Sequence, residues 1–281
     1  MPNQVNLRYP GGRDRALTFS YDDGVQQDAT LVDIFAEHGL KGTFNLNSGL
    51  FASEGETFAP GTVLRRMTLT DILKTFKGTP HEIGIHGLTH PNLERLTGNR
   101  LMYEIMEDRA RLEAHFNTIV RGGAYPYGTW NDETVAALSA SSIAYCRTTQ
   151  STLRFDQPQN WLLLSPTCHH NEPRLMELAK SFIQDQNLRA PYLFYVWGHS
   201  YEFERDQNWD VIRRFAELTG HNANVYYATN IELYDYCQAF RSLRFNSIGT
   251  IMENPTAIPL WYECQGVVAC IRPGDRVTLS V

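Results

Sequence analysis

The stretch ALTFSYDDG, residues 16–24, decides the fold, because an apolar run ends there in two acids and a glycine. Residues 16–21 are typical of a short strand, and Gly24 permits the sharp turn that would bring both carboxylates into one cavity. His86 and His90 are four residues apart, so a helical turn would place both imidazoles on one face. Two imidazoles and one carboxylate leave coordination positions open, which is typical of a catalytic metal site rather than a structural one.

The second carboxylate of the pair Asp22 and Asp23 would be left over for proton transfer. A free carboxylate beside a metal-activated water indicates a hydrolase. Either element alone has an ordinary explanation, since an Asp-Asp-Gly turn is a common polar loop and two histidines can be neighbours by chance. The prediction therefore depends on both elements occurring in one chain.

Strand-like apolar runs alternate with helical periodicity along most of the chain, which predicts parallel strands joined by helices. Further strands are expected at residues 42–46, 81–85, 120–125, 144–146, 162–164, 192–197 and 225–228. Helices are expected from Leu31 to a stop at Gly39 and at residues 70–76, 97–116, 132–139, 173–184, 209–218 and 231–240, the last capped by Asn230. Polar candidates recur at the ends of these strands, where barrel enzymes carry their active sites.

The fold class expected from this pattern is α/β, a distorted (β/α) barrel over residues 1–245. Residues 246–281 differ, because short β runs there are split by Gln265-Gly266 and Pro273-Gly274-Asp275. They predict a small C-terminal antiparallel β appendage packed on the barrel, as a lid or an oligomer contact.

Composition excludes several classes of partner. The chain has 281 residues, 42% of them hydrophobic, which suffices for a sizeable core. A net charge of -6 without a Lys/Arg run argues against nucleic acid. No apolar run approaches a membrane span and no export signal is visible, so we expect a cytoplasmic protein without a membrane partner. Five cysteines without a Cys-x-x-Cys pair predict free, buried thiols.

The combined motifs resemble those of the polysaccharide deacetylase family, the metallohydrolases that include chitin and peptidoglycan deacetylases. The family's Thr-Phe-Asp-Asp-Gly motif corresponds to residues 18–24, and its His-(Ser/Thr)-x-x-His motif to residues 86–90. The third motif, Arg-x-Pro-x-Gly, aligns with residues 124–128, and the late catalytic histidine with His199. The resemblance spans residues 7–240 and is specific in its first two motifs.

The resemblance implies a ligand set for one divalent metal. Asp23, His86 and His90 would hold the ion. Zinc is the default for such donors, and cobalt or nickel also fit them.

The resemblance also implies catalytic roles. Asp22 would be the base and His199 the acid that protonates the leaving nitrogen. The backbone N–H of Tyr127 would help to stabilise the oxyanion.

Two departures from the family pattern stand out. Ala124 occupies the position of the third-motif arginine that orients the base, and Arg121 is a weak substitute because it would lie inside the strand. The fourth motif is not recognisable, although His169 and His170 lie in the nearest stretch and could orient His199 or touch substrate. Their neighbour Cys168 could in principle be a nucleophile or a ligand.

Three residues are candidates for contact with substrate. Trp161 and Trp197 could shape a pocket for the acyl methyl group, although tryptophan is as often simply core. Glu202 follows His199 in a polar and aromatic segment that could grip a sugar.

The predicted function is that of a metal-dependent hydrolase of carbon–nitrogen bonds other than peptide bonds. It would remove an acetyl group from an N-acetylated sugar or short oligosaccharide by means of a metal-activated water. The same site would suit an O-acetyl esterase or another C–N amide hydrolase. Two rival functions are a noncatalytic carbohydrate-binding barrel, which lost turnover with the missing arginine, and a metal-dependent sugar isomerase. A homo-oligomer is compatible with the sequence.

Overall fold

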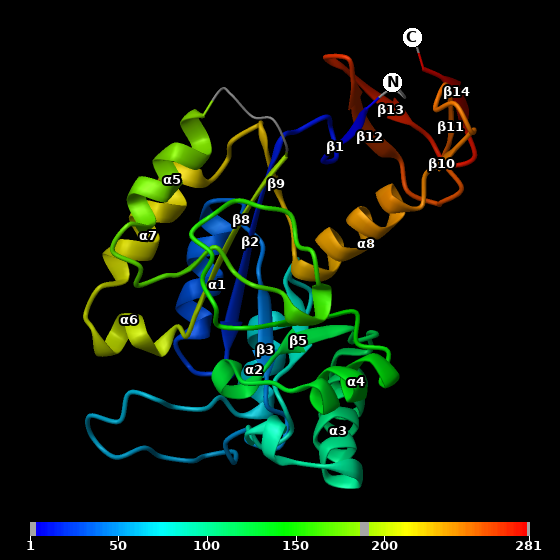
Figure 1. The fold of residues 1–281 in the computed structure, drawn as a ribbon. Helices are drawn as coiled ribbons and strands as arrows, with labels where there is room; N and C mark the ends of the chain where they lie inside the picture. Colours follow the sequence, from blue (N-terminus) through cyan, green and yellow to red (C-terminus); the bar gives the residue numbers. More distant parts are fainter. Residues whose placement is uncertain (1–3, 186–190, 280–281) are drawn as a thin grey trace.

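A parallel sheet forms the centre of the protein in the computed structural model, which describes residues 4–185 and 191–279 (Figure 1). Its strands run in the order β6-β5-β4-β3-β2-β8-β7, and β9 pairs with β2. The strands are β2 (Arg15–Asp22), β3 (Thr43–Leu46), β4 (Glu82–Ile85), β5 (Gly122–Ala124), β6 (Tyr145–Arg147), β7 (Cys168–His169), β8 (Tyr192–Gly198) and β9 (Val225–Tyr227).

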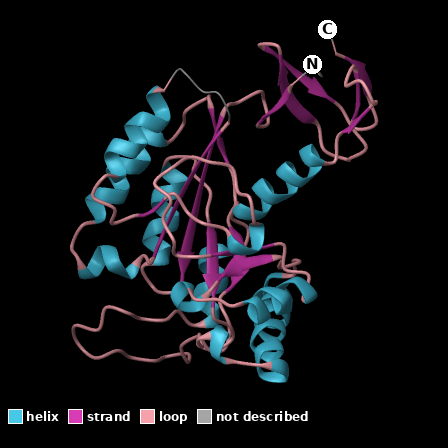
Figure 2. Ribbon diagram, in the orientation of Figure 1, coloured by secondary structure: helices cyan, strands magenta, loops and turns pink. Residues whose placement is uncertain are grey.

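Helices surround this curled sheet, as Figure 2 shows, which confirms the predicted distorted (β/α) barrel. They are α1 (Asp28–Glu37), α2 (Leu69–Phe76), α3 (Gly98–Phe116), α4 (Asp132–Ala140), α5 (Leu175–Gln184), α6 (Tyr201–Arg205), α7 (Trp209–Thr219) and α8 (Asn230–Arg241). Short 3-10 turns occur at η1 (Leu93–Arg95), η2 (Pro126–Gly128) and η3 (Trp161–Leu163). Over the described ranges, no helix is long and apolar enough to cross a membrane.

Strand β2 is the core of the sheet, and all eight of its residues are buried. On one edge β8 pairs with it from Arg15 to Tyr21. Its other edge is shared by β9 near the start and by β3 at the end. A strand enclosed in this way cannot slip without exposing apolar side chains, so Asp22 at its end is held in a fixed position.

The C-terminal strands are antiparallel, as predicted. One sheet joins β10 (Arg244–Phe245), β11 (Ile251–Glu253) and β14 (Arg276–Thr278), and the other joins β12 (Leu260–Cys264) and β13 (Val267–Ile271). The second sheet gains a strand that was not predicted, β1 (Val5–Arg8), which pairs with β12. The domain boundary at residue 245 stays a prediction, but the chain's first strand lies in the C-terminal sheet.

The C-terminal sheets lie beside the start of β2 (Figure 1), whereas Asp22 is the last residue of that strand. The Tyr236 hydroxyl of α8 links the β1–β12–β13 sheet to the barrel, since it donates to the carbonyl of Arg8 and accepts from the N–H of Trp261. The appendage therefore does not cover the end where the candidate residues lie. The suggestion of a lid was wrong, because β1 leads directly into the start of β2 and holds the appendage there.

Two local predictions differ from the structure. Residues 162–164 do not form a strand: Asn160 accepts a hydrogen bond from the N–H of Leu162 and starts the η3 turn, leaving only a bridge from Leu164 to Arg147. Thr229, not Asn230, caps α8, because its side chain accepts from the N–H of Glu232 in a reciprocal capping box.

A buried carboxylate, Asp28 at the start of α1, ties together two segments next to the candidate site. It accepts hydrogen bonds from the N–H of Val25 and from the hydroxyl of Ser200, which follows His199. Burial raises the pKa of Asp28 from 3.8 to about 7.

We expect Asp28→Asn to change how stability depends on pH. Between pH 4 and 7 the folded state keeps a proton on Asp28 that the unfolded state has lost, so the free energy of unfolding falls as the pH rises, by up to ~1.4 kcal/mol per unit. Asparagine does not titrate, and it can accept from the N–H of Val25 and donate to the Ser200 hydroxyl, so the variant should lose this part of the slope. Urea unfolding at pH 5 and 7 measures it, with the exposed Asp33→Asn on the same helix as the control. Parallel curves for Asp28→Asn and the wild type would contradict the prediction.

Candidate active site

A cavity of about 460 Å³ at the carboxyl ends of the strands gathers most of the predicted residues. It is lined by Asp22, Asp23, His86, His90, Tyr127, Trp197 and His199, together with Leu64, Arg66 and neighbours. These residues come from segments that follow β2, β4, β5 and β8. Convergence at the carboxyl ends of parallel strands is the arrangement that barrel enzymes use.

The three predicted metal ligands lie together. One ligand atom from each of Asp23, His86 and His90 lies within 4.8 Å of the other two. The predicted helical turn was wrong, because the chain leaves β4 through a turn with Gly87 at φ +70° and His90 at φ 54°. This turn brings the two imidazole centroids to 4.8 Å.

Hydrogen bonding and burial prepare His86 to act as a ligand. Its Nδ1 lies 2.8 Å from the carbonyl oxygen of Ala124, so Nδ1 carries the proton and the Nε2 lone pair is free. Burial lowers the pKa of His86 to about 4 and also lowers the pKa of His90, so both rings are neutral at pH 7. Neutral imidazoles are the form that binds a metal.

Arg66 orients the carboxylate of Asp23 and was not singled out from the sequence. Its NH2 lies 3.0 Å from Asp23 Oδ1, and its NH1 donates to the Asp23 carbonyl and to Asn47. No local pattern marks this arginine, because it comes from the long loop between β3 and α2.

Three residues that line this cavity have strained backbone conformations. Asp23, His90 and Tyr127 all have positive φ, at 89°, 54° and 61°. Each such conformation costs on the order of 1–3 kcal/mol in a residue other than glycine. The Tyr127 ring is exposed and packs edge-on against His90, with centroids 4.6 Å apart.

Arg147 supplies the cation that Ala124 lacks. It is fully buried, forms an ion pair with Asp22, and stacks on Trp197 with its guanidinium carbon 4.3 Å from the ring centroid. Arg147 lies on β6 directly opposite Ala124 on β5, so the arginine has moved one strand along. Arg121 is instead paired with Asp235 at 2.9 Å. The sequence does carry a signal for this role, because Arg147 follows directly after the apolar strand predicted at residues 144–146.

The surroundings of Asp22 keep it ionised. Burial alone would raise its pKa, but Arg147, His86 and His199 and a 2.7 Å hydrogen bond from Asn45 lower it to about 2. Asp22 is therefore a carboxylate at neutral pH and can accept a proton.

His199 faces the two acids across the cavity. Its Nε2 lies 3.9 Å from Asp22 Oδ2 and 4.0 Å from Asp23 Oδ2. Burial alone would lower its pKa, but Glu202, Asp22 and Asp23 together raise it. The ring can therefore carry a proton into the cavity.

Two of the three predicted substrate-contact residues do not line this cavity. Trp161 is buried in η3 with its ring against Tyr234, and the carboxylate of Glu202 points to His169 at 3.0 Å. Only Trp197 lines the cavity. Cys168 is fully buried, and burial raises its pKa to about 12, which argues against a nucleophile.

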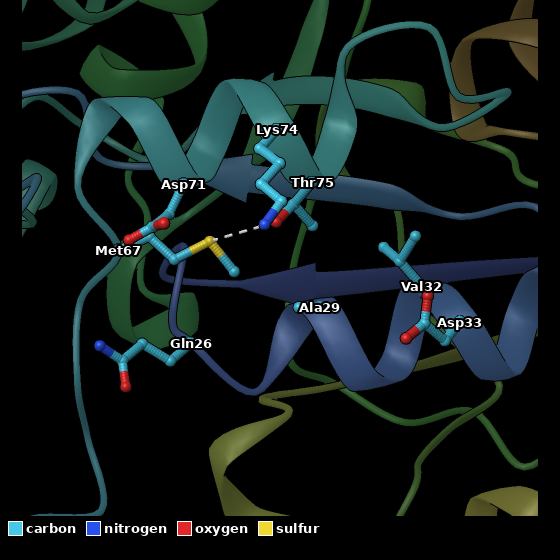
Figure 3. A pocket seen from close by; sticks show the side chains of 8 residues that line it. All are labelled: Gln26, Ala29, Val32, Asp33, Met67, Asp71, Lys74 and Thr75. Carbon is cyan, nitrogen blue, oxygen red and sulfur yellow. Dashed lines mark hydrogen bonds between the residues drawn. The ribbon is translucent and has the colours of Figure 1, made fainter.

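A second cavity, of about 540 Å³, lies between α1 and α2 (Figure 3). It is lined by Gln26, Lys74 and Thr75 among others, and the Thr75 hydroxyl lies 3.8 Å from the Met67 sulfur. It contains no predicted site residue.

Comparison with known proteins relates part of the chain to a family. The family model for polysaccharide deacetylase matches residues 10–145. Nearly half of the chain thus matches this family. A chitooligosaccharide deacetylase from Bradyrhizobium sp. (strain ANU 289) is 25% identical over 133 residues, which cover 46% of this chain and 54% of that protein. The chain thus spans about half the length of this curated relative.

Two solved structures of family members share the fold. A putative polysaccharide deacetylase from Mycobacterium smegmatis is 15% identical with a TM-score of 0.59, covering 86% of this chain and 96% of that one. The Xyl-CE4 domain of a multidomain xylanase from the hindgut metagenome of Trinervitermes trinervoides is 14% identical with a TM-score of 0.52, covering 80% and 92%. At these identities the likeness supports the barrel alone.

We expect Arg147→Met to destabilise this barrel strongly, because it leaves the Asp22 carboxylate buried and unpaired. Breaking such a pair costs ~3–5 kcal/mol, whereas the exposed pair lost in Arg121→Met is worth ~0–1 kcal/mol. The double variant Asp22→Asn/Arg147→Met should recover much of the loss. The measurement is the free energy of unfolding in urea for Arg147→Met, Arg121→Met and the double variant. Equal losses for Arg147→Met and Arg121→Met would show that the ion pair has no such role.

Proposed function

We propose that the protein is a metal-dependent hydrolase that removes the acetyl group from an N-acetylated sugar. The observation that carries the proposal is the meeting of five side chains in one cavity. Three of them, Asp23, His86 and His90, form a ligand set, and two, Asp22 and His199, remain free to move protons.

The donor set fits a divalent ion. One carboxylate and two neutral imidazoles converge, with Arg66 and the Ala124 carbonyl orienting two of the three. Zinc is the first choice, and cobalt and nickel also suit these donors. When bound, the ion would acidify a water molecule and polarise the acetyl carbonyl.

The protein's own groups would then complete the hydrolysis. Asp22, ionised and fixed by Arg147 and Asn45, would take a proton from the attacking water. The N–H of Tyr127 would donate to the oxyanion that forms when water adds to the carbonyl carbon. His199 would deliver a proton from Nε2 to the nitrogen as the C–N bond breaks, releasing acetate and the free amine.

The substrate is proposed to be an N-acetylated monosaccharide or short oligosaccharide. The name of the Bradyrhizobium relative, a chitooligosaccharide deacetylase, supports this class. Trp197 is the aromatic side chain that would contact the acyl group, since it lines the cavity. Cytoplasmic location and oligomeric state stay predictions.

The same groups would cleave an O-acetyl ester or another C–N amide. A noncatalytic sugar-binding barrel is disfavoured, because such a protein has no need of a base and an acid beside a ligand set. An acetate-release screen against N-acetylated monosaccharides, oligomers and acetyl esters, with added zinc, cobalt or nickel, tests the proposal. Acetate from esters alone would assign an esterase, and no acetate from any substrate would contradict the proposal.

The double variant His86→Ala/His90→Ala should lose bound metal, because only one of the three ligands remains. The measurement is metal content per protein by elemental analysis after zinc loading and desalting. His115→Ala on α3 is a control for loss of a histidine elsewhere. Unchanged zinc in the double variant would rule out this ligand set.

Asp22→Asn and His199→Ala should each bind metal normally but release acetate from an N-acetylated sugar more slowly. Loss of a positioned base or acid lowers the rate by roughly 10²–10⁴-fold. His199→Ala should slow an activated acetyl ester less, because its leaving group needs no proton. Initial rates on both substrates decide, and near-normal amide turnover in either variant would refute the assigned role.

A further inference from the structure

The carboxylate of Glu202 lies at the centre of three histidines behind the cavity. Its Oε2 is 3.0 Å from His169 Nε2, 3.4 Å from His170 Nε2 and 3.4 Å from His199 Nδ1. The same oxygen accepts the backbone N–H of His199 at 3.2 Å. One carboxylate thus contacts both the backbone and the ring of the proposed acid.

Glu202 is held as an anion. It lies in the first turn of α6, where Arg205 approaches its other oxygen at 3.6 Å. Burial alone would raise its pKa, but the rings of His169 and His199 beside it hold the pKa of Glu202 well below its usual range. An ionised carboxylate has no proton to donate, so it favours a protonated nitrogen on each ring that faces it.

The tautomer of His169 is fixed by its neighbour. The N–H of Asn171 donates to His169 Nδ1 at 3.1 Å, so in the neutral ring the proton is on Nε2, which points at Glu202. Although His169, His170 and Glu202 could be grouped as metal ligands, a metal on this Nε2 would require an imidazolate. A proton, not a metal, therefore links His169 to Glu202.

The ring of His170 packs behind the carboxylate of Glu202. It is fully buried and stacks on Phe203 at 4.1 Å and on Tyr21 at 5.7 Å between ring centroids. Gly198 is needed beside it, because a Cβ at that position would overlap the ring. Burial lowers the pKa of His170 well below its usual value, so it adds no charge.

We propose that Glu202, anchored by His169, is a positioning residue that fixes the orientation and tautomer of His199. With Nδ1–H directed at Glu202, the other nitrogen, Nε2, is the one that faces Asp22 and Asp23 in the cavity. The carboxylate also stabilises the imidazolium that exists before the proton leaves for the amine nitrogen. This inference rests on the proposed function, because it takes His199 as the acid, and it gives Glu202 a different role from the predicted sugar contact.

The kinetic test uses Glu202→Gln on an N-acetylated sugar and on an activated acetyl ester. We expect kcat for the amide to fall, up to the roughly 10²–10⁴-fold that a positioned acid contributes, with KM nearly unchanged and the ester spared. Glu202→Asp should retain more activity than Glu202→Gln. His169→Gln, whose amide can still donate, should retain more than His169→Leu. An equal fall in kcat for the amide and the ester, or a change in KM with kcat unaltered, would overturn the inference.

A double-variant comparison separates action through His199 from general damage. In a His199→Ala background, Glu202→Gln should cause no further loss, because the group it positions is gone. Independent, multiplying losses would show that Glu202 acts elsewhere. Glu204→Gln is the matched control, since this acid lies on the same helix and pairs with Arg65 at 2.8 Å. It should turn over like the wild type.

A spectroscopic readout needs no turnover. In ¹⁵N-histidine spectra of the folded protein, taken at a pH high enough for the ring to be neutral, His199 should be the Nδ1–H tautomer in the wild type and Glu204→Gln, and a mixture in Glu202→Gln. His169→Leu provides the same readout if Glu202→Gln does not fold. A fixed tautomer without acetate release would refute the proposed function but not the positioning. Acetate release with a tautomer indifferent to Glu202 and His169 would refute the positioning alone.

Discussion

The buried ion pair between Asp22 and Arg147 is the interaction on which the site depends, and it requires a curved sheet. Between β2 and β6 lie β3, β4 and β5, so a flat sheet would hold their axes ~19 Å apart. No arginine side chain spans that distance. The pair forms because the sheet curls until both strand ends face one interior, where Trp197 of β8 covers the guanidinium. The curvature of the sheet and the ion pair therefore depend on each other, because flattening the sheet would leave two buried charges without a partner.

The candidate site residues are held in place by neighbouring groups. The carbonyl of Ala124 fixes the tautomer of His86, and Ala124 lies opposite Arg147 in the sheet. Arg66 and Asn45 fix one acid each. Three strained backbone positions, at Asp23, His90 and Tyr127, also lie around the cavity.

Features that depend on the local pattern of residues could be predicted from the sequence. Buried parallel strands are continuous apolar runs, so β2 and β8 and the acids and histidine at their ends were predictable. Features set by distant contacts were not. Arg147 acquires its role from a strand four positions away in the sheet, and the turn that carries His90 depends on a positive φ that its residue type does not reveal. The polar segment after His199 suggested a sugar contact for Glu202, but the structure places its carboxylate against His169.

The pairing of β1 with β12 links the two ends of the chain, and the Arg8–Glu263 ion pair closes a separation of 255 residues. Contacts this distant in sequence form late, because closing a long loop costs entropy before any contact compensates for it. During synthesis, β1 leaves the ribosome long before its partner strand exists. The strand β1 therefore stays unpaired until β12 has been synthesised.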